Sequence, residues 1–456
     1  MGESESYGGK MKILVLTVGG SCAPIITSIN QNFPDDVYFI CSDDLDIVKG
    51  SYNTVVGDGK VCGKDPKNPD EVNILKQVGL NKDNEWEKEH IHKIKNFDDL
   101  NECYIESLSL LKTIKDKNPG AEIIIDYTGG TKSMSVGLGA AAMDISGITV
   151  CLVKGTRTDL IKVQNGTQRI RLTQMNMVFL KRQVEIAENL MDRYDYDGAI
   201  SILEDTAKIP NIPDEIDAQI GKYLNISKAY LAWDRFDHFE AWRLLHNYRR
   251  WYVKNVMFLE AVLWSHKKFD EDFDKTAIEG LSLSQKGCGY EIVEDIVLNA
   301  QRRAKQGKYD DATGRLYRAL ELLIQLRLRL EYSILTANID VEKLPDVYKN
   351  EYEAKRDKKD NKIKIGLKES YELLVKKNRE DPLAKIYTEK EKYLWNSLNV
   401  RNNSLYAHGL TPILKEQYEE FHKIFVDDIL EKFLLDFGSK HIQRCQFKIN
   451  NLNNPH

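Results

Sequence analysis

The 456-residue sequence has few cysteines, and they are scattered along the chain. No two of them form a C-x-x-C pair, and their number is odd: Cys22, Cys41, Cys62, Cys103, Cys151, Cys288 and Cys445. This pattern favours free thiols in a reducing cytoplasm over a zinc site or a disulfide framework. The sequence also lacks an apolar run of about 18 residues, so it predicts no membrane span. The polar N-terminus has no secretory apolar stretch, and residues 1–10 are expected to be a disordered lead.

A strong charge excess is also missing. The formal net charge is −5, which excludes a protein that coats nucleic acid with a uniformly basic surface but allows a local basic groove. Residues 355–380 form one basic segment, with ten Lys or Arg against five Asp or Glu. This segment is either a solvated surface or a rim that holds phosphates. The chain is longer than a single hydrophobic core usually supports, so two or three domains are expected.

Four short, nearly continuous apolar runs occur before residue 180. They are Lys12–Thr17, Val37–Cys41, Glu122–Asp126 and Thr149–Val153. Helical patterns lie between them, over residues 99–116 and 131–144. Apolar strands that alternate with helices predict a parallel sheet covered on both faces. We therefore expect a Rossmann-like α/β domain over residues 11–178.

Strand signals almost vanish after residue 180, and amphipathic helices are expected over residues 180–207, 214–268 and 288–336. Two similar segments begin at Tyr194 (YDYDGAI) and Lys308 (KYDDAT). Each is expected to be a turn that starts a helix with Asp near its positive end. Two copies are too few for a repeat protein. The second half of the chain is therefore expected to be all-α.

Arg401 and His408 stand seven residues apart near the C-terminus. The segment between them begins Asn402-Asn403-Ser404, which has poor helix propensity, so a helix is expected to break there and bring the two side chains closer. Histidine titrates near neutrality and can move a proton from a ribose 2′-hydroxyl or to a leaving 5′-oxygen. A guanidinium stabilises the phosphorane-like transition state. On spacing alone, a surface Arg and a helix-capping His explain the pair better than a catalytic site does.

Two glycine-containing loops follow predicted strands. One is Thr17-Val-Gly19-Gly20-Ser21, and the other is Thr128-Gly129-Gly130-Thr131-Lys132-Ser133, which opens a helix. Loops at the carboxyl edge of a parallel sheet bind ligands, and free N–H groups at a helix N-terminus attract phosphate. The sequence has no Walker A motif, and Gly137–Ala142 lies inside a predicted helix, where small residues serve packing. A nucleotide pocket is therefore predicted, with a ligand-free tight turn as the alternative.

The residue sequences of both sites resemble motifs of one protein family. The stretch Asp126-Tyr-Thr-Gly-Gly-Thr-Lys-Ser-Met resembles the ligand loop of CARF domains in CRISPR-associated proteins, over about residues 11–175. Arg401 to His408 resembles the R-x(4–6)-H motif of HEPN ribonucleases, and Tyr309–Glu321 resembles their first long helix. The resemblance implies catalytic roles for Arg401, Asn402 and His408. It implies contacts with a cyclic oligoadenylate from Gly19, Gly20, Ser21, Ser42, Asp43, Thr128, Gly129, Gly130, Thr131, Lys132 and Ser133, where Ser42 and Asp43 follow from position alone.

The resemblance further implies a cytoplasmic homodimer that cleaves single-stranded RNA in type III CRISPR defence once cyclic oligoadenylate binds. Cyclic tetra-adenylate is the preferred activator, with hexa-adenylate next. No metal, no other cofactor and no stable DNA binding are expected. The expected domains are the CARF-like sensor (11–178), a helical connector (179–286), a HEPN domain (287–445) and a tail (446–456). Three alternatives stay open: a sensor with an inactive HEPN domain, a toxin-like HEPN nuclease with another nucleotide ligand, and a nucleotide-binding scaffold without catalysis.

Overall fold

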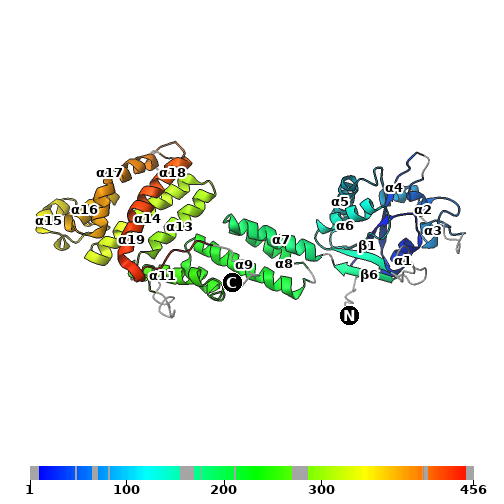
Figure 1. Cartoon of the computed structure of the whole chain (residues 1–456), viewed down its shortest axis with the longest axis horizontal. Coiled ribbons are helices and arrows are strands. Elements are labelled where there is room, and N and C mark those ends of the chain that lie inside the picture. The colour runs from blue at the N-terminus through cyan, green and yellow to red at the C-terminus, as the bar shows by residue number, and fades with distance from the viewer. Residues whose placement is uncertain are drawn as a thin grey trace, which may run out of the picture. The chain divides into compact units, whose positions relative to one another are not determined.

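The computed structural model describes residues 10–46, 49–63, 70–80, 83–154, 169–174, 176–209, 212–269, 286–402, 404 and 409–447 (Figure 1). The chain divides into two compact units. The first comprises residues 1–185 and 204–220, and the second comprises residues 186–203 and 221–456.

The first unit is built on a six-stranded sheet with the order β3-β2-β1-β4-β5-β6. Its strands are β1 (Lys12–Val18), β2 (Asp36–Ser42), β3 (Ile91–Ile94), β4 (Glu122–Asp126), β5 (Ile148–Lys154) and β6 (Arg169–Gln174). Neighbouring strands are parallel except β5 and β6, which pair antiparallel. The four strands predicted from apolar runs are all present in the sheet.

Helices cover both faces of this sheet (Figure 1). The helices of this unit are α1 (Ala23–Asn32), α2 (Tyr52–Val56), α3 (Ile74–Gln77), α4 (Asn84–His90), α5 (Leu100–Lys117) and α6 (Lys132–Met143). Along β1, Ile13 and Val15 pack in the same core as α5 and α6, whereas Leu14 and Leu16 pack with α1, α2 and α3. Successive strand residues point to opposite faces, so a strand buried on both sides must be apolar throughout. This arrangement confirms the Rossmann-like α/β prediction.

The prediction of a purely parallel sheet is wrong at one edge. Strand β6 runs antiparallel to β5, and the sequence analysis identified neither β6 nor β3. In β6, Arg169 and Arg171 are exposed while Ile170 is half-buried. An edge strand with one face in water alternates polar and apolar residues, so it gives no continuous apolar run.

The prediction that all cysteines are free is also wrong. Cys22 and Cys62 form a disulfide with their Cα atoms 5.8 Å apart, although 40 residues separate them in sequence. The free cysteines are Cys41, Cys103, Cys151, Cys288 and Cys445. The pairing depends on the fold, because the start of α1 lies beside a distant turn and the spacing of two cysteines in sequence does not reveal such proximity. The disulfide holds the chain directly after the Gly19-Gly20-Ser21 loop.

We expect reduction of this disulfide to destabilise the first unit. A cross-link that closes a 40-residue loop restricts the unfolded chain, which corresponds to about 3–4 kcal/mol of unfolding free energy. Urea unfolding followed by circular dichroism should therefore show a lower midpoint with reductant, and Cys62→Ser should reproduce that midpoint without reductant. Cys445→Ser, at a free cysteine, should keep the wild-type response to reductant. Equal wild-type midpoints with and without reductant would contradict the disulfide.

From residue 176 onward the described chain is helical apart from short turns and one bridge between Ser404 and Thr411. The helices are α7 (Asn176–Asp192), α8 (Tyr196–Ala207), α9 (Asp214–Asp234), α10 (His238–His246), α11 (Val253–Phe269), α13 (Glu291–Lys305), α14 (Tyr309–Tyr332), α15 (Asp346–Glu353), α16 (Leu367–Lys377), α17 (Pro382–Asn402), α18 (Lys415–His422) and α19 (Glu431–Leu434). A π-helical stretch, Lys423–Leu430, joins α18 to α19. Within the described part of the chain, no helix is both long and apolar enough to cross a membrane.

The two predicted turns are confirmed. Helix α8 begins at Tyr196 with Asp197 in its first turn, and α14 begins at Tyr309 with two Asp residues in its first turn. The helical range predicted over residues 214–268 contains three helices, because the chain turns at Phe236 (φ 63°) and again between α10 and α11. The turn at Phe236 is a third copy of the predicted turn that the sequence analysis did not recognise.

Helix α13 lies in the core of the second unit and buries polar as well as apolar side chains. Its Asp295 accepts hydrogen bonds from Trp233 Nε1 (2.8 Å) and His238 Nε2 (2.8 Å). Its Arg302 donates to Asp234 Oδ1 at 2.7 Å and is fully buried. Buried charges are tolerated when they are paired and hydrogen-bonded, so these contacts explain how a helix with this many charges can be central.

Candidate functional site

The two glycine loops of the first unit touch each other. Strands β1 and β4 are adjacent and parallel, so their following loops share one edge of the sheet. Thr17 Oγ1 donates to the carbonyl oxygen of Gly129 at 2.8 Å. A Cβ atom on Gly19 would lie 2.7 Å from Gly130 N, and one on Gly129 would lie 2.3 Å from Thr17 O. Glycine is required at both positions because backbone meets backbone there.

The side chains at the start of α6 differ in whether they are already bonded within the protein. The Thr131 hydroxyl donates to the Phe97 carbonyl at 2.6 Å and accepts from Met134 N–H at 3.3 Å, as an N-cap. The Ser133 hydroxyl donates to the Asp98 carbonyl at 2.8 Å. Lys132 is exposed, and no carboxylate of the described residues pairs with it. Of the three residues predicted here, Lys132 therefore has the side chain most available to an anion.

Polar groups beneath the loop hold it in place. Thr128 N–H donates to Asp126 Oδ1 at 2.8 Å, and Thr128 Oγ1 accepts from Val153 N–H at 2.9 Å. Asp126 is fully buried, and this burial raises the pKa of its carboxyl group. Asp126 and Thr17 were not predicted from the sequence as positioning residues. The sequence did contain a pattern that could have identified them, since each is a polar residue near the end of an otherwise apolar strand.

Ser42 and Asp43 follow β2 at the same edge of the sheet, but their groups are bound locally. The Ser42 hydroxyl accepts from Ser51 N–H at 2.9 Å, and the Ser51 hydroxyl accepts from Ser42 N–H at 2.8 Å. The Asp43 carboxylate accepts from Asp44 N–H at 3.0 Å. Asp44 accepts from Gly50 N–H at 2.7 Å, which lowers the pKa of that carboxyl group. Gly20 and Ser21, after β1, are exposed.

In the second unit, Arg401 lies in the last turn of α17. Its guanidinium carbon is 4.2 Å from the centre of the Tyr317 ring on α14, within the range of a cation–π contact. His408 lies outside the described residues, as does the side chain of Asn402. The described residues contain no cluster of three or more His, Cys, Asp or Glu side chains suited to a metal ion.

The chain leaves α17 in a closed turn. Ser404 N–H donates to the Arg401 carbonyl at 3.0 Å, and Gly409 N–H donates to the Ser404 carbonyl at 3.1 Å. The predicted helix break between Arg401 and His408 is therefore confirmed, and the chain ends that flank residues 405–408 meet. Ile413 N–H then donates to Asp310 Oδ2 at 3.1 Å. Asp310 and Tyr317 of α14 thus contact both sides of the motif; the sequence analysis assigned neither a role.

The basic segment of residues 355–380 has half of its ten Lys and Arg side chains paired with nearby carboxylates. Five of its basic side chains lie within salt-bridge distance of a carboxylate: Lys355, Arg356, Lys364, Lys368 and Lys376. These contacts favour the solvated-surface alternative over a phosphate-binding rim, because a carboxylate neighbour offsets the attraction of each cation for phosphate.

Comparison with known proteins matches the helical part of the chain to two domains of one family. A family model for the Csm6 6H domain matches residues 179–277, and a model for the Csm6 HEPN domain matches residues 281–431. The sequence analysis had treated the middle helices only as a connector, and the 6H match identifies them as part of a family domain. No curated protein sequence matches the chain significantly.

One solved structure shows the same architecture. Enterococcus italicus Csm6 bound to cyclic hexa-2′-fluoro-hexa-dAMP superposes with a TM-score of 0.58 at 13% identity, covering 94% of this chain and 95% of that one. Can2 from Sulfobacillus thermosulfidooxidans, in complex with cyclic tetra-adenylate, gives a TM-score of 0.21 at 12% identity over 51% of this chain and 68% of that one, too low to support an argument. An N-terminal Rossmann-like sheet followed by 6H and HEPN helices, with two family models matching over half of the residues, shows that the chain belongs to the Csm6 family of CRISPR-associated CARF–HEPN proteins.

Proposed function

We propose that this protein is a single-stranded RNA endoribonuclease of type III CRISPR defence that cyclic oligoadenylate activates. The observation that carries the proposal is Arg401, held against Tyr317 where α17 breaks, inside the segment matched by the Csm6 HEPN model. The proposed domains keep the bounds expected from sequence: 11–178 for the sensor, 179–286 for the middle helices and 287–445 for the nuclease.

In the proposed reaction, the 2′-oxygen of a ribose attacks the adjacent phosphorus and the 5′-oxygen of the next nucleotide leaves. His408 takes the proton from the 2′-hydroxyl or supplies one to the 5′-oxygen. Arg401 donates two hydrogen bonds to the phosphoryl oxygens as negative charge builds on them. The cation–π contact with Tyr317 restricts the orientation of the Arg401 guanidinium, so less conformational entropy is lost when it binds phosphate. Asn402 orients the phosphate or ribose.

The activator is proposed to bind at the carboxyl edge of the β1, β2 and β4 strands. Lys132 contributes a free ammonium there, and the glycine loops allow phosphates to approach the backbone. A ring of identical nucleotides has rotational symmetry, which suits a pocket shared by two copies of the chain. Binding then stabilises the dimer arrangement in which the two HEPN motifs are productive. Cyclic tetra-adenylate remains the preferred ligand, with hexa-adenylate tested beside it because the Enterococcus relative holds a cyclic hexanucleotide analogue.

The full chain incubated with labelled single-stranded RNA and EDTA should cleave it only when a cyclic oligoadenylate is added. Tri-, tetra- and hexa-adenylate rings are compared in parallel, which also identifies the ring size. Linear oligoadenylate of the same length is the control for ring recognition. Cleavage without any activator would favour the toxin-like alternative. Absence of cleavage with all three rings, in protein that binds one of them, would favour a sensor with an inactive HEPN domain.

A further inference from the structure

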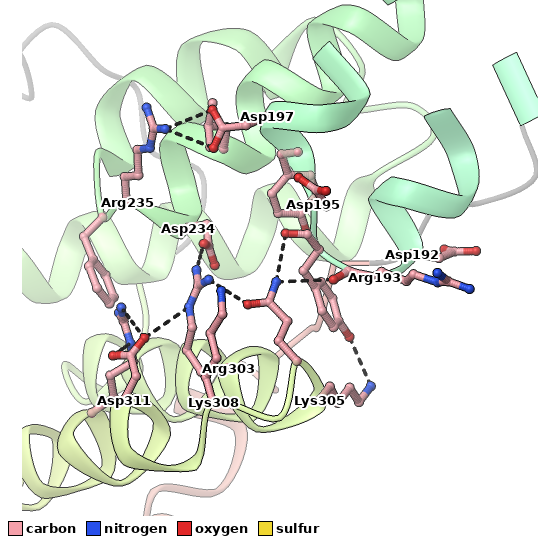
Figure 2. Close-up of a pocket in the computed structure, with 16 residues that line it drawn as sticks. Asp192, Arg193, Asp195, Asp197, Asp234, Arg235, Arg303, Lys305, Lys308 and Asp311 are labelled. Atoms are coloured by element: carbon pink, nitrogen blue, oxygen red, sulfur yellow. Dashed lines mark hydrogen bonds and ion pairs between the residues drawn. The ribbon is translucent and has the colours of Figure 1, made fainter. Parts of the chain in front are cut away.

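The second unit contains a solvent-open cavity of about 1040 Å³ that the proposed reaction does not use. Figure 2 shows it between the α7–α8 turn, the α9–α10 turn and the start of α14. These are the three related turns described above. Each has one residue in the left-handed region: Tyr194 (φ 61°), Phe236 (φ 63°) and Gly307 (φ 74°). A cavity of this size is large enough for a nucleotide.

Two of these three positions carry aromatic rings where glycine would avoid strain. A bulky residue at positive φ costs about 1–3 kcal/mol, so a compensating use for the ring is expected. Tyr194 has a structural use, because its ring is buried and its hydroxyl accepts from Lys305 Nζ at 3.0 Å. Phe236 is 37% exposed in the cavity wall, with the Arg315 guanidinium carbon 5.7 Å from its ring centre. The Phe236 ring is thus partly exposed, with the Arg315 guanidinium over it and the edge of the His238 ring 5.9 Å away between ring centres.

Six of the eleven charged side chains in the cavity wall form ion pairs with one another. Arg303 pairs with Asp234, Arg235 with Asp197 and Arg315 with Asp311. Figure 2 shows the side chains of Asp192 and Arg193 pointing away from this cluster. Lys308, at the first position before α14, is exposed and has no carboxylate partner within the described ranges. The cavity wall thus contains an exposed ammonium at a helix N-terminus and a partly exposed aromatic ring, groups suited to a phosphate and to a base respectively.

The cavity and the Arg401 motif share the first turns of α14. Asp311 and Arg315 of this helix line the cavity, whereas Tyr317 contacts Arg401 and Asp310 contacts Ile413 after the motif. Because residues 310 and 311 are consecutive, the two sites lie on neighbouring flanks of one helix. A helix with its side chains is only about 10–12 Å across, a distance that a few nucleotides of an extended single strand can cover.

From this placement we propose that the cavity is a binding subsite for the single-stranded RNA substrate. One base stacks on Phe236, and an adjoining phosphate contacts Lys308 at the start of α14. This inference rests on the proposed ribonuclease function. It identifies a site that binds nucleotides of the RNA away from the phosphate that reacts. Stacking on an aromatic face tolerates any base, so the subsite contributes affinity rather than sequence preference.

Binding is measured with the full chain, saturating activator and a fluorescent single-stranded RNA whose 2′-hydroxyls are methylated, so that it cannot be cleaved. Phe236→Leu should raise the dissociation constant at least about fivefold, the low end for loss of one stacked base. Lys308→Glu should also weaken RNA binding. It should reduce the slope of log affinity against log salt by the amount that corresponds to about one phosphate contact, whereas Phe236→Leu should leave that slope unchanged. With cleavable RNA, both variants should raise KM more than they lower kcat.

The chain offers matched controls. Phe33 also has positive φ (47°), is 81% exposed and lies in the first unit, so Phe33→Leu controls for loss of a strained surface phenyl. Lys254 is an exposed lysine on α11 outside the cavity wall, so Lys254→Glu controls for the charge change. Both controls should bind RNA as the wild type does. Circular dichroism melting verifies that every variant is folded.

The results separate the two proposals. If the wild type cleaves RNA but folded Phe236→Leu and Lys308→Glu bind the methylated strand as tightly as the wild type, the subsite is overturned and the ribonuclease function stands. If the wild type binds the methylated strand through these residues but never cleaves RNA, the ribonuclease function fails and the subsite stands. A wild type that neither binds nor cleaves single-stranded RNA overturns both.

Discussion

Replacing His408 by alanine should slow RNA cleavage at least about a hundredfold, because no other group is proposed to move the proton of the 2′-hydroxyl or the leaving 5′-oxygen. Arg401→Lys should reduce the rate of RNA cleavage by a similar factor. Lysine keeps the charge but has no planar fork for two phosphoryl oxygens and stacks less well on the Tyr317 ring, 4.2 Å from the Arg401 guanidinium carbon.

Single-turnover cleavage at saturating activator measures both losses, and calorimetric titration of the activator verifies that the sensor is intact. His246→Ala is the matched control, since His246 is exposed at the end of α10 and belongs to neither site. Undiminished cleavage by His408→Ala would exclude the proposed acid–base role. Weakened activator binding in either motif variant would instead indicate a folding defect.

Gly129→Ala should abolish activation at ordinary concentrations of cyclic oligoadenylate. The added Cβ atom would lie 2.3 Å from the Thr17 carbonyl oxygen, so one of the two ligand loops must move. We expect at least about a tenfold weaker activator affinity and about 1–3 kcal/mol lower stability, the usual cost of forcing an extra carbon into packed structure. Because the HEPN motif is unchanged, a large excess of activator should restore the rate of RNA cleavage.

The matched control lies in the helix that follows. A Cβ on Gly139 of α6 would meet no atom within 4 Å, so Gly139→Ala should keep activator affinity and stabilise the helix by up to about 1 kcal/mol. The two affinities are compared by calorimetry. If Gly129→Ala binds the activator as tightly as Gly139→Ala does, the contact between the two glycine loops does not shape the ligand site.

The strands of the first unit were predictable where both of their faces are buried. For β4 the predicted range, Glu122–Asp126, equals the observed one. A strand covered on both faces must be apolar at every position, and such a run is recognised locally. Strands β3 and β6 were missed because strands at the edges of the sheet carry polar residues that resemble a loop.

The candidate sites divide in the same way. Helix propensity predicted the break after Asn402, because propensity is a property of a short segment. Arg401 and His408 were singled out by their resemblance to the HEPN motif, since their chemistry and spacing alone also fit a surface Arg and a helix-capping His. The roles of Tyr317 and Asp310 were not predictable, because they depend on which face of α14 packs against a segment about 90 residues later. The local bonds of the Thr131 and Ser133 hydroxyls likewise depend on the position of residues 97 and 98.

The sequence by itself determined the α/β and all-α halves and the two glycine loops. These features depend on periodicity, propensity and residue chemistry, which act over a few neighbouring residues. Only the tertiary structure decided that Cys22 meets Cys62, that Gly19 touches Gly130, and that three separated turns enclose one cavity beside α14. Such contacts join residues that are distant in the chain, so they arise from how the elements pack.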